Sequence, residues 1–415
     1  MTLICNILLV ILAVGLLVPV AIVCVECVAA LMPRRRSGTQ PPAARPRVAV
    51  LVPAHDEETG VASAIAALRP QLLDGDRLLV VADNCTDATA RVARAAGADV
   101  IERNDPLRRG KGYALDFGLN ALAADPPDVV VMIDADCHTG PGAVNTLARA
   151  AASTGRPVQA TNLLEQPSES GSRDCLSALA FTMKNLVRPR GLHRVGLPCM
   201  LTGTGMAFPW SVVRQAPLAS GNIVEDMQLG IHLAMRGFTT VHCSEARVTG
   251  RLPQNSSAAS KQRTRWEHGH LQTLLHEVPR LAAAGLRRRS LALVALAADL
   301  SVPPLSLLAL LMTGGTTLAA AAAACGLWML PAILLSAGAV LLLGSILTVW
   351  AVFARNTLPL GRLLAVPLYM AWKIPIYLSF IVRREKAWVR TERDSAIERK
   401  PAAPHEEHHC AESID

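Results

Sequence analysis

The sequence of 415 residues predicts an α/β domain whose mainly parallel sheet is covered by helices, joined to helices that cross a membrane. Three observations lead to this prediction. Short β-branched runs alternate with segments of helical spacing. Several of these runs are apolar on both faces, as buried parallel strands are. Long uncharged stretches lie on either side of the alternating part.

The alternation begins with a strand predicted at 48–53, and apolar residues at Val61, Ile65 and Leu68 predict the helix after it. The pattern then repeats, with strands expected at 77–82, 99–102 and 129–133 and helices at 88–96 and 112–123. Strands connected through helices run parallel, and ligands of such sheets bind beyond the carboxyl ends of the strands. We therefore looked for polar residues at those ends.

Two uncharged stretches are long enough to cross a bilayer. The first, Met1 to Val25, would extend about 37 Å as a helix, against a hydrocarbon core of about 30 Å. It lacks the basic start of a signal peptide, so a retained anchor is expected. The second, Leu300 to Ala354, has room for two spans with a turn at Cys325–Pro331. Pro303–Pro304 should break the first of these spans near its start.

These features divide the chain into an anchor (1–33), a soluble domain (45–255), a helix at the membrane interface (256–289), a membrane block (290–382) and a tail (383–415). Arg34–Arg36 and Arg287–Arg289 flank the spans, which predicts that the soluble domain and the tail face the cytoplasm. The net charge of +8 should then favour contact with anionic membrane lipids. We expect no nucleic-acid partner, because no basic stripe is interleaved with aromatic residues.

Two segments near the membrane are open to more than one interpretation. The pattern of 256–289 fits an interfacial helix and a core helix about equally. Leu363–Val382 is apolar but carries Lys373 at its centre, and a lysine is costly inside a bilayer. We expect a helix at the interface there, with a third span as the alternative.

Polar residues stand at the carboxyl ends of three predicted strands: His55, Asp83 and Asp134. Asp134 and Asp136 are one residue apart and would repel each other unless a divalent cation such as Mg²⁺ or Mn²⁺ lies between them. Lys111, between two glycines, would offer a positive charge to a diphosphate. Taken singly, Asp83 could merely cap a helix, and Lys111 could be a solvated charge.

Two later motifs also have both a chemical and an ordinary explanation. Glu225 and Asp226 begin a predicted helix that ends before Gly237. Acidic residues there complement the helix dipole, and a carboxylate there can also take a proton from an attacking hydroxyl. Arg265 and Trp266 fit a membrane-border pair, and they also fit a phosphate clamp beside a platform for a sugar ring.

Together, the segment 50–58, Asp83, Asp134–Asp136, Glu225–Asp226 and Gln262–Trp266 resemble the processive branch of glycosyltransferase family 2. This branch contains the membrane synthases of cellulose, chitin, hyaluronan and poly-N-acetylglucosamine, and the resemblance covers about residues 45–285. It implies a GT-A fold and a divalent cation. It also implies transfer of a sugar from a UDP-sugar to an acceptor hydroxyl, with inversion at the anomeric carbon.

The resemblance also implies roles for single residues. The nucleotide-sugar would be bound by Pro53, His55, Glu57, Asp83 at the uracil, Lys111 at the phosphates and Asp134 at the nucleoside. Asp136 would hold the metal, and Asp226 would be the general base with Glu225 beside it. The acceptor and the diphosphate would lie against Thr202, Gly203, Gln262, Arg265 and Trp266. Thr202 and Val224 depart from the Cys and Thr that are common in the family.

Three functions fit this reasoning. The first is synthesis of a polysaccharide or other cell-surface glycan at a bacterial inner membrane, possible export partners included. The second is transfer of a single sugar to a lipid-linked acceptor at the cytoplasmic face, and the small number of spans favours it over a polymer channel. The third is a membrane scaffold without catalysis, which would be favoured if Asp136 or Asp226 were missing; both are present.

Overall fold

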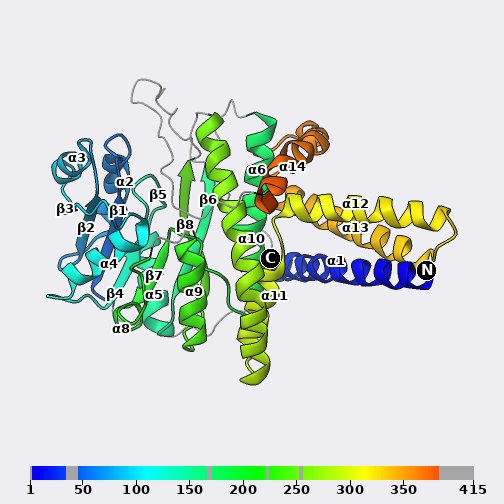
Figure 1. Cartoon of the computed structure of the whole chain (residues 1–415). Coiled ribbons are helices and arrows are strands. Elements are labelled where there is room, and N and C mark those ends of the chain that lie inside the picture. The colour runs from blue at the N-terminus through cyan, green and yellow to red at the C-terminus, as the bar shows by residue number, and fades with distance from the viewer. Residues whose placement is uncertain (1, 34–44, 166–170, 221–223, 252–255, 383–415) are drawn as a thin grey trace.

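The computed structural model describes residues 2–33, 45–165, 171–220, 224–251 and 256–382. One sheet of eight strands lies at the centre of the domain, in the order β3-β2-β1-β4-β7-β6-β8-β5. Figure 1 shows this sheet and its helices on one side of the molecule and a bundle of long helices projecting from the other. The arginines at 34–36 and the tail 383–415 lie outside the described residues.

The first half of the sheet follows the predicted alternation. Its strands are β1 (Val48–Ala54), β2 (Arg77–Asp83), β3 (Asp99–Arg103) and β4 (Val129–Met132), and they pair in parallel. The helices between them are α2 (Val61–Leu68), α3 (Thr89–Ala95) and α4 (Lys111–Leu122), with a short 3₁₀ turn at Arg69–Gln71. These bounds lie within about one residue of the predicted ones, which confirms a parallel α/β core.

The second half of the sheet is mixed. Its strands are β5 (His138–Thr139), β6 (Val158–Glu165), β7 (Met206–Pro209) and β8 (Val241–Arg251), and its helices are α5 (Ala143–Thr154), α8 (Trp210–Val213) and α9 (Glu225–Met235). Strand β7 runs antiparallel to both β4 and β6, whereas β6 and β8 are parallel. The parallel order that we predicted therefore stops at β4.

Alternate residues of β1 face different layers, which explains why this strand is apolar throughout. Val50 and Val52 pack in the core beneath α2 and α5, whereas Leu51 packs with residues of α4 and α9 on the opposite face. A central strand that is covered on both sides has no polar face to present. This three-layer packing fixes the strand ends that carry the polar residues.

Helices between the sheet and the bundle connect the two parts of the molecule. They are α6 (Ser172–Thr182), the π-helical segment Met183–Val187, α7 (Arg188–Arg194), α10 (Ser256–Arg287) and α11 (Leu291–Ser301). In Figure 1, α10 and α11 run across the base of the bundle, at a steep angle to its helices. Helix α10 packs against α9 of the domain as well as α11 and α14. It thus contacts both sides, so the interfacial and the core interpretation each describe part of it.

The described residues include four helices that are long and apolar enough to cross a membrane, at Thr2–Leu31, Leu305–Ala324, Leu330–Ala354 and Leu360–Val382. They correspond to α1, to α12, to α13 (Leu330–Val349) with a π-helical turn at Trp350–Ala354, and to α14 (Val366–Val382) with a 3₁₀ turn at Leu360–Ala365. The breaks at Pro303–Pro304 and at Cys325–Met329 fall where the sequence predicts them. Figure 1 shows α1, α12 and α13 running alongside one another, while α14 lies across the base of this bundle.

A buried ion-pair cluster attaches the bundle to the domain. Arg188 donates from Nε to Glu26 Oε2 of α1 at 2.5 Å and from Nη2 to Asp299 Oδ1 of α11 at 2.6 Å. Gly191 allows the close approach, because a Cβ there would lie 2.1 Å from the carbonyl oxygen of Glu26. The anchor is therefore held to the domain by specific contacts as well as by the chain.

Candidate active site

All of the site residues named from the sequence lie on the wall of one cavity of about 440 Å³. They are Pro53, His55, Glu57, Asp83, Lys111, Asp134, Asp136, Thr202, Gly203, Glu225, Asp226, Gln262, Arg265 and Trp266. The cavity begins at the carboxyl ends of β1, β2 and β4, where a parallel sheet offers its ligand site. Segments more than 200 residues apart in the chain thus meet around one space.

The ends of β1 and β2 are tied together at the edge of this cavity. His55 donates from Nδ1 to the carbonyl oxygen of Asp83 at 2.7 Å. The buried carboxylate of Asp83 accepts from Arg103 Nη1 at 2.6 Å, and Arg103 in turn lies over the ring of Tyr113. The Glu57 N–H donates to Thr89 Oγ1 at 2.7 Å. These contacts fix Asp83 and Glu57 on the wall before any ligand arrives.

Lys111 stands at the first position of α4 and reaches into the cavity. Its ammonium group pairs with Asp134 and donates to the carbonyl oxygen of Gly203 at 2.5 Å. Burial opposes the charge of Lys111, but the nearby carboxylates of Asp134 and Glu225 outweigh it and raise its pKa. The next residue must be glycine, because a Cβ on Gly112 would lie 2.3 Å from the carbonyl oxygen of Leu218.

Three potential metal ligands follow β4, with their ligand atoms within 4.8 Å of one another: Asp134, Asp136 and Cys137. Burial raises the pKa of Cys137 well above its ordinary value, and a soft sulfur ligand suits Mg²⁺ and Mn²⁺ less well than carboxylate oxygens do. Asp134 already pairs with Lys111. A hard cation would therefore depend mainly on Asp136, with oxygens of a bound diphosphate as further ligands, and this oxygen donor set suits Mg²⁺ or Mn²⁺.

Glu225 and Asp226 begin α9 and face the same space. Asp226 lies against the loop that contains Thr202 and Gly203, where a Cβ on Gly203 would be 3.3 Å from Asp226 Oδ2. Burial raises the pKa of Asp226, and Lys111 and Lys184 offset only part of this effect. Burial together with Asp226 raises the pKa of Glu225 to about 7, although Lys111 acts against it. Lys111 therefore favours the ionised form of both carboxyl groups, but burial has the larger effect on their pKa values.

Helix α10 carries the Gln262–Trp266 motif along the cavity wall. Gln262 is buried, and its Oε1 atom has no hydrogen-bond partner among the described residues. The ring of Trp266 packs against Phe181 with centroids 5.8 Å apart. Because Arg265 and Trp266 both line the cavity, the structure favours the site interpretation over the membrane-border pair.

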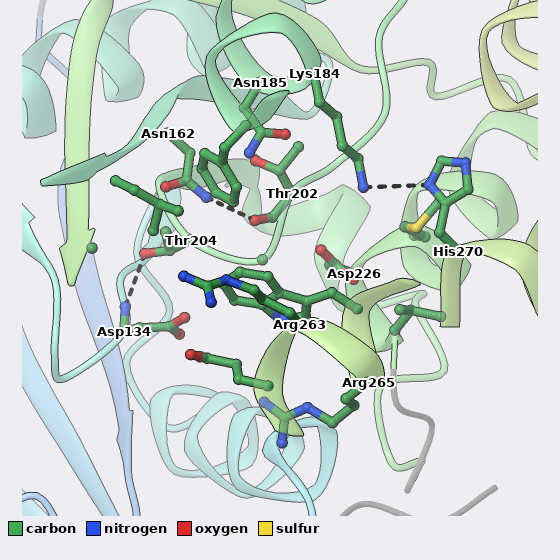
Figure 2. A pocket seen from close by; sticks show the side chains of 18 of the residues that line it. Asp134, Asn162, Lys184, Asn185, Thr202, Thr204, Asp226, Arg263, Arg265 and His270 are labelled. Carbon is green, nitrogen blue, oxygen red and sulfur yellow. Dashed lines mark hydrogen bonds between the residues drawn. The ribbon is translucent and has the colours of Figure 1, made fainter. Parts of the chain in front are cut away.

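The sequence reasoning missed several polar residues of this cavity. Lys184, Asn185 and His270 line it together with Asp226 and Thr202, as Figure 2 shows. Lys184 and Asn185 lie in the π-helical segment and belong to no motif that we recognised. His270 follows Trp266 by four residues on one helix, and this spacing was the only signal that could have indicated it.

The cavity continues beyond the domain to the apolar helices. Val23 of α1, Pro303, Leu305 of α12 and Tyr369 and Lys373 of α14 also line it. The same space is thus bounded by strand ends on one side and by candidate membrane spans on the other.

Residues 46–269, more than half of the chain, match the family model described as "Glycosyltransferase like family 2". The chain therefore belongs to glycosyltransferase family 2. The mannosyltransferase PcManGT from Pyrobaculum calidifontis, solved with GDP-Man and Mn²⁺, has a similar structure, with a TM-score of 0.53 and 20% identity. The alignment covers 88% of this chain and 99% of that one, and it shows that the fold is of the GT-A type.

Curated relatives match a shorter stretch. Glucosyl-3-phosphoglycerate synthase of Mycolicibacterium paratuberculosis is 42% identical over 96 residues, which is 21% of this chain and 28% of that protein. The low-salt glycan biosynthesis hexosyltransferase Agl6 of Haloferax volcanii is 38% identical over 96 residues, or 22% of this chain and 21% of that protein. The match thus spans between 21% and 28% of these relatives. Membership of the processive branch stays a prediction.

Proposed function

We propose that the chain is a membrane-bound inverting glycosyltransferase that transfers one sugar from a UDP-sugar to a lipid-linked acceptor. The observation that carries this proposal is the single cavity that begins at the strand ends and continues to the apolar helices. A donor soluble in water would enter beside the sheet, and an acceptor with an apolar anchor would enter beside the spans. Family membership supports the class of reaction.

The donor would lie along the first half of the sheet. Pro53, His55, Glu57, Asp83 and Asp134 would surround the nucleoside, while Lys111 and Arg265 would face the diphosphate. A divalent cation held by Asp136 would, when bound, neutralise charge that develops on the departing diphosphate. The Mn²⁺ in the mannosyltransferase structure supports such a site here.

The transfer would be a direct displacement. The acceptor hydroxyl oxygen attacks the anomeric carbon from the face opposite the diphosphate and forms the new glycosidic bond. The bond between that carbon and the diphosphate oxygen breaks, and its electron pair leaves with UDP. Asp226 accepts the hydroxyl proton, and Glu225 beside it modulates the charge at this position. The sugar therefore inverts its anomeric configuration.

The acceptor would be held by two elements that meet at Asp226. The loop with Thr202 and Gly203 would lie along one side, and Gln262 and Trp266 of α10 would lie along the other. The indole of Trp266, fixed against Phe181, offers a flat apolar face to a sugar ring.

The packing of the bundle favours a single transfer over polymer export. Residues of α1, α12 and α13, among them Ala13, Met312 and Leu335, form one apolar cluster. A Cβ on Gly338 would lie 2.5 Å from Leu17, so these helices are in close contact. A polymer would need a polar path, and this interior is apolar. The Gln262–Trp266 motif in the cavity nevertheless supports a growing polysaccharide as the second candidate acceptor.

We propose a bacterial cytoplasmic membrane as the location, with the catalytic domain on the cytoplasmic side. Helix α10 ends with Arg287, and Arg288 and Arg289 follow directly, where basic residues favour the cytoplasm. UDP-sugars are soluble in water, so an active site on this side would reach its donor directly.

The experiment is a measurement of UDP release by the purified full chain in detergent, with a panel of UDP-sugars and either Mg²⁺ or Mn²⁺. Membranes with a radiolabelled donor then identify the product. A labelled lipid that extracts into organic solvent supports the proposed acceptor, whereas a high-mass polymer supports the second candidate. No release with any sugar, in the presence of membrane extract, would overturn both.

A further inference from the structure

Lys184 is one of the positively charged side chains that line the cavity, and it lies beside the predicted base, Asp226. Lys184 projects from the π-helical segment Met183–Val187 toward α10, and Figure 2 shows it beside His270, with Asp226 between this pair and Asp134 in the view. Lys184 and Asp226 are close enough to influence each other electrostatically. Lys184 therefore lies where an acceptor, and not the donor nucleotide, would be expected.

The partner of Lys184 is neutral. Lys184 donates from Nζ to His270 Nδ1 at 3.3 Å, and His270 donates from Nε2 to the carbonyl oxygen of Val302 at 3.1 Å. Burial lowers the pKa of His270 well below its ordinary value, so the ring stays uncharged. Among the residues that the structure describes, none offers Lys184 a carboxylate at ion-pair distance. Burial lowers the pKa of Lys184 although Asp226 acts against this effect, and an anionic ligand would favour the charged ammonium.

Two polar side chains beside Lys184 lack partners. Asn185 is 4% exposed, and its Oδ1 atom has no hydrogen-bond partner among the described residues. The buried hydroxyl of Thr202 is in the same condition, although its backbone is fixed by Gln159 and Asn162. Buried polar groups are rarely left unsatisfied, and here both side chains line the cavity. An acceptor oxygen of a ligand would take the Thr202 hydroxyl proton in a hydrogen bond, whereas Asn185 Oδ1 would accept from a hydroxyl group of the ligand.

We infer that Lys184 and the hydroxyl of Thr202, with His270 positioning Lys184, form an anion pocket that binds a phosphate group of the sugar acceptor. A phosphate monoester carries a charge of about −1.5 to −2 at pH 7 and three strong acceptor oxygens. Near the carboxylate of Asp226 this charge would be repelled unless a cation lies between them, and Lys184 supplies that cation. The inference rests on the proposed sugar transfer and specifies the chemistry of its acceptor.

The position of the anion pocket suits a ligand that arrives from the membrane. His270 is hydrogen-bonded to the carbonyl oxygen of Val302. This residue stands directly before Pro303–Pro304 and the start of α12. The π-helical segment contacts α1, the anchor. An isoprenyl phosphate could place its chain beside these helices and its phosphate on Lys184. A small soluble phosphate monoester would offer the same group, so the test compares both.

The test measures binding to the purified full chain in detergent by calorimetry, with UDP and Mg²⁺ present at saturation. The two ligands are farnesyl phosphate in the micelles and glycerol 3-phosphate in solution; farnesol and glycerol serve as uncharged counterparts. We expect wild type to bind at least one phosphate, and Lys184→Met to weaken that binding by about 10- to 100-fold. Tighter binding of farnesyl phosphate indicates a lipid source, and tighter binding of glycerol 3-phosphate a soluble one.

Matched variants keep the result interpretable. Lys261→Met removes an exposed lysine of α10 and should leave phosphate binding unchanged. Lys184→Arg keeps the charge and should retain measurable binding. Unchanged UDP affinity shows that the variants fold. If Lys184→Met does not fold, Thr202→Val removes only a hydroxyl and should weaken phosphate binding by about 2- to 10-fold.

Three results would overturn the anion pocket: no binding of either phosphate to wild type, equal binding to wild type and Lys184→Met, or an equal loss with Lys261→Met. A change in the pH profile of transfer without a change in phosphate affinity would reassign Lys184 to the charge balance of Asp226. Failure of the proposed function is distinguishable, because phosphate binding without any UDP release would contradict sugar transfer and leave the pocket intact.

Discussion

At the scale of single residues, a substitution of Asp226 is expected to slow the transfer step without weakening donor binding. Asp226→Asn keeps the size of the side chain but removes the proton acceptor. We expect UDP release that depends on an acceptor to fall by about 10²- to 10⁴-fold, the usual contribution of a general base. The affinity for UDP with Mg²⁺ should stay within about threefold of wild type, because Asp226 lies on the acceptor side. Unchanged turnover would remove the base assignment.

The raised pKa values of the Glu225–Asp226 pair predict the pH dependence. Burial raises both, the pKa of Glu225 to about 7, so the pair holds a proton near neutral pH more readily than free carboxyls would. A base works only when ionised, so the transfer rate should rise with pH from about 6 to 8. Glu225→Gln removes one negative charge, lowers the pKa of Asp226 and should move this rise to lower pH. A flat rate from pH 5 to 8 in both proteins would contradict this account.

Most donor-side residues could be predicted because they end buried strands, where the pattern of Val48–Ala54 and Val129–Met132 locates the polar residue directly. The ion pairs among the charged residues of the site could not be predicted in the same way. The contact of Lys111 with Asp134 and that of Asp83 with Arg103 depend on how side chains pack in space. Lys184 and Asn185 belong to no recognised motif, so the sequence did not predict the proposed anion pocket.

At the scale of elements, a polar cluster connects the motif helix α10 to α14. Lys373 is 2% exposed and pairs with Glu267, the residue after Trp266. Tyr377 donates to Glu267 Oε2 at 2.6 Å and contacts Ser306 of α12. This arrangement explains how α14 accommodates a lysine among apolar residues, and it links the position of Trp266 to the apolar helices.

Breaking this ion pair on one side should destabilise the protein. Lys373→Met leaves Glu267 without its cation, and we expect the free energy of unfolding in detergent to fall by roughly 3–5 kcal/mol. The double variant Lys373→Met with Glu267→Met should recover much of this loss, because no buried charge is left alone. Denaturant unfolding of the four proteins of this cycle provides the measurement. A loss in the double variant that equals the sum of the two single losses would show that the pair does not interact.

The elements of the first half of the sheet follow from periodicity, whereas in the second half the sequence predicted helix α9 but not the strands. Strand β5 has two residues and β7 has four, too short for an alternating pattern to be visible. Helix α10 carries polar residues that are buried, including Arg263 and His268, so its pattern fits neither a surface nor a core helix. These departures from pattern occur beside the cavity.

At the scale of the whole molecule, one cavity lies between the sheet domain and the apolar helices. The domain presents its strand ends to the cavity, and the apolar helices border the opposite side. The GT-A fold of the domain accounts for the strand ends on one side of the cavity. The ion pair between Glu26 of α1 and Arg188 accounts for the position of the apolar helices on the other side. This arrangement would allow the proposed enzyme to take its donor from water and its acceptor from the membrane.

The measurement that tests the central claim most directly is the binding isotherm of UDP, with and without Mn²⁺, for wild type and Asp136→Ala. If acidic residues and a cation converge on the diphosphate, Mn²⁺ should strengthen UDP binding to wild type at least tenfold, and Asp136→Ala should abolish this gain. An isotherm of wild type that is the same with and without Mn²⁺, or a full gain in the variant, would contradict the account.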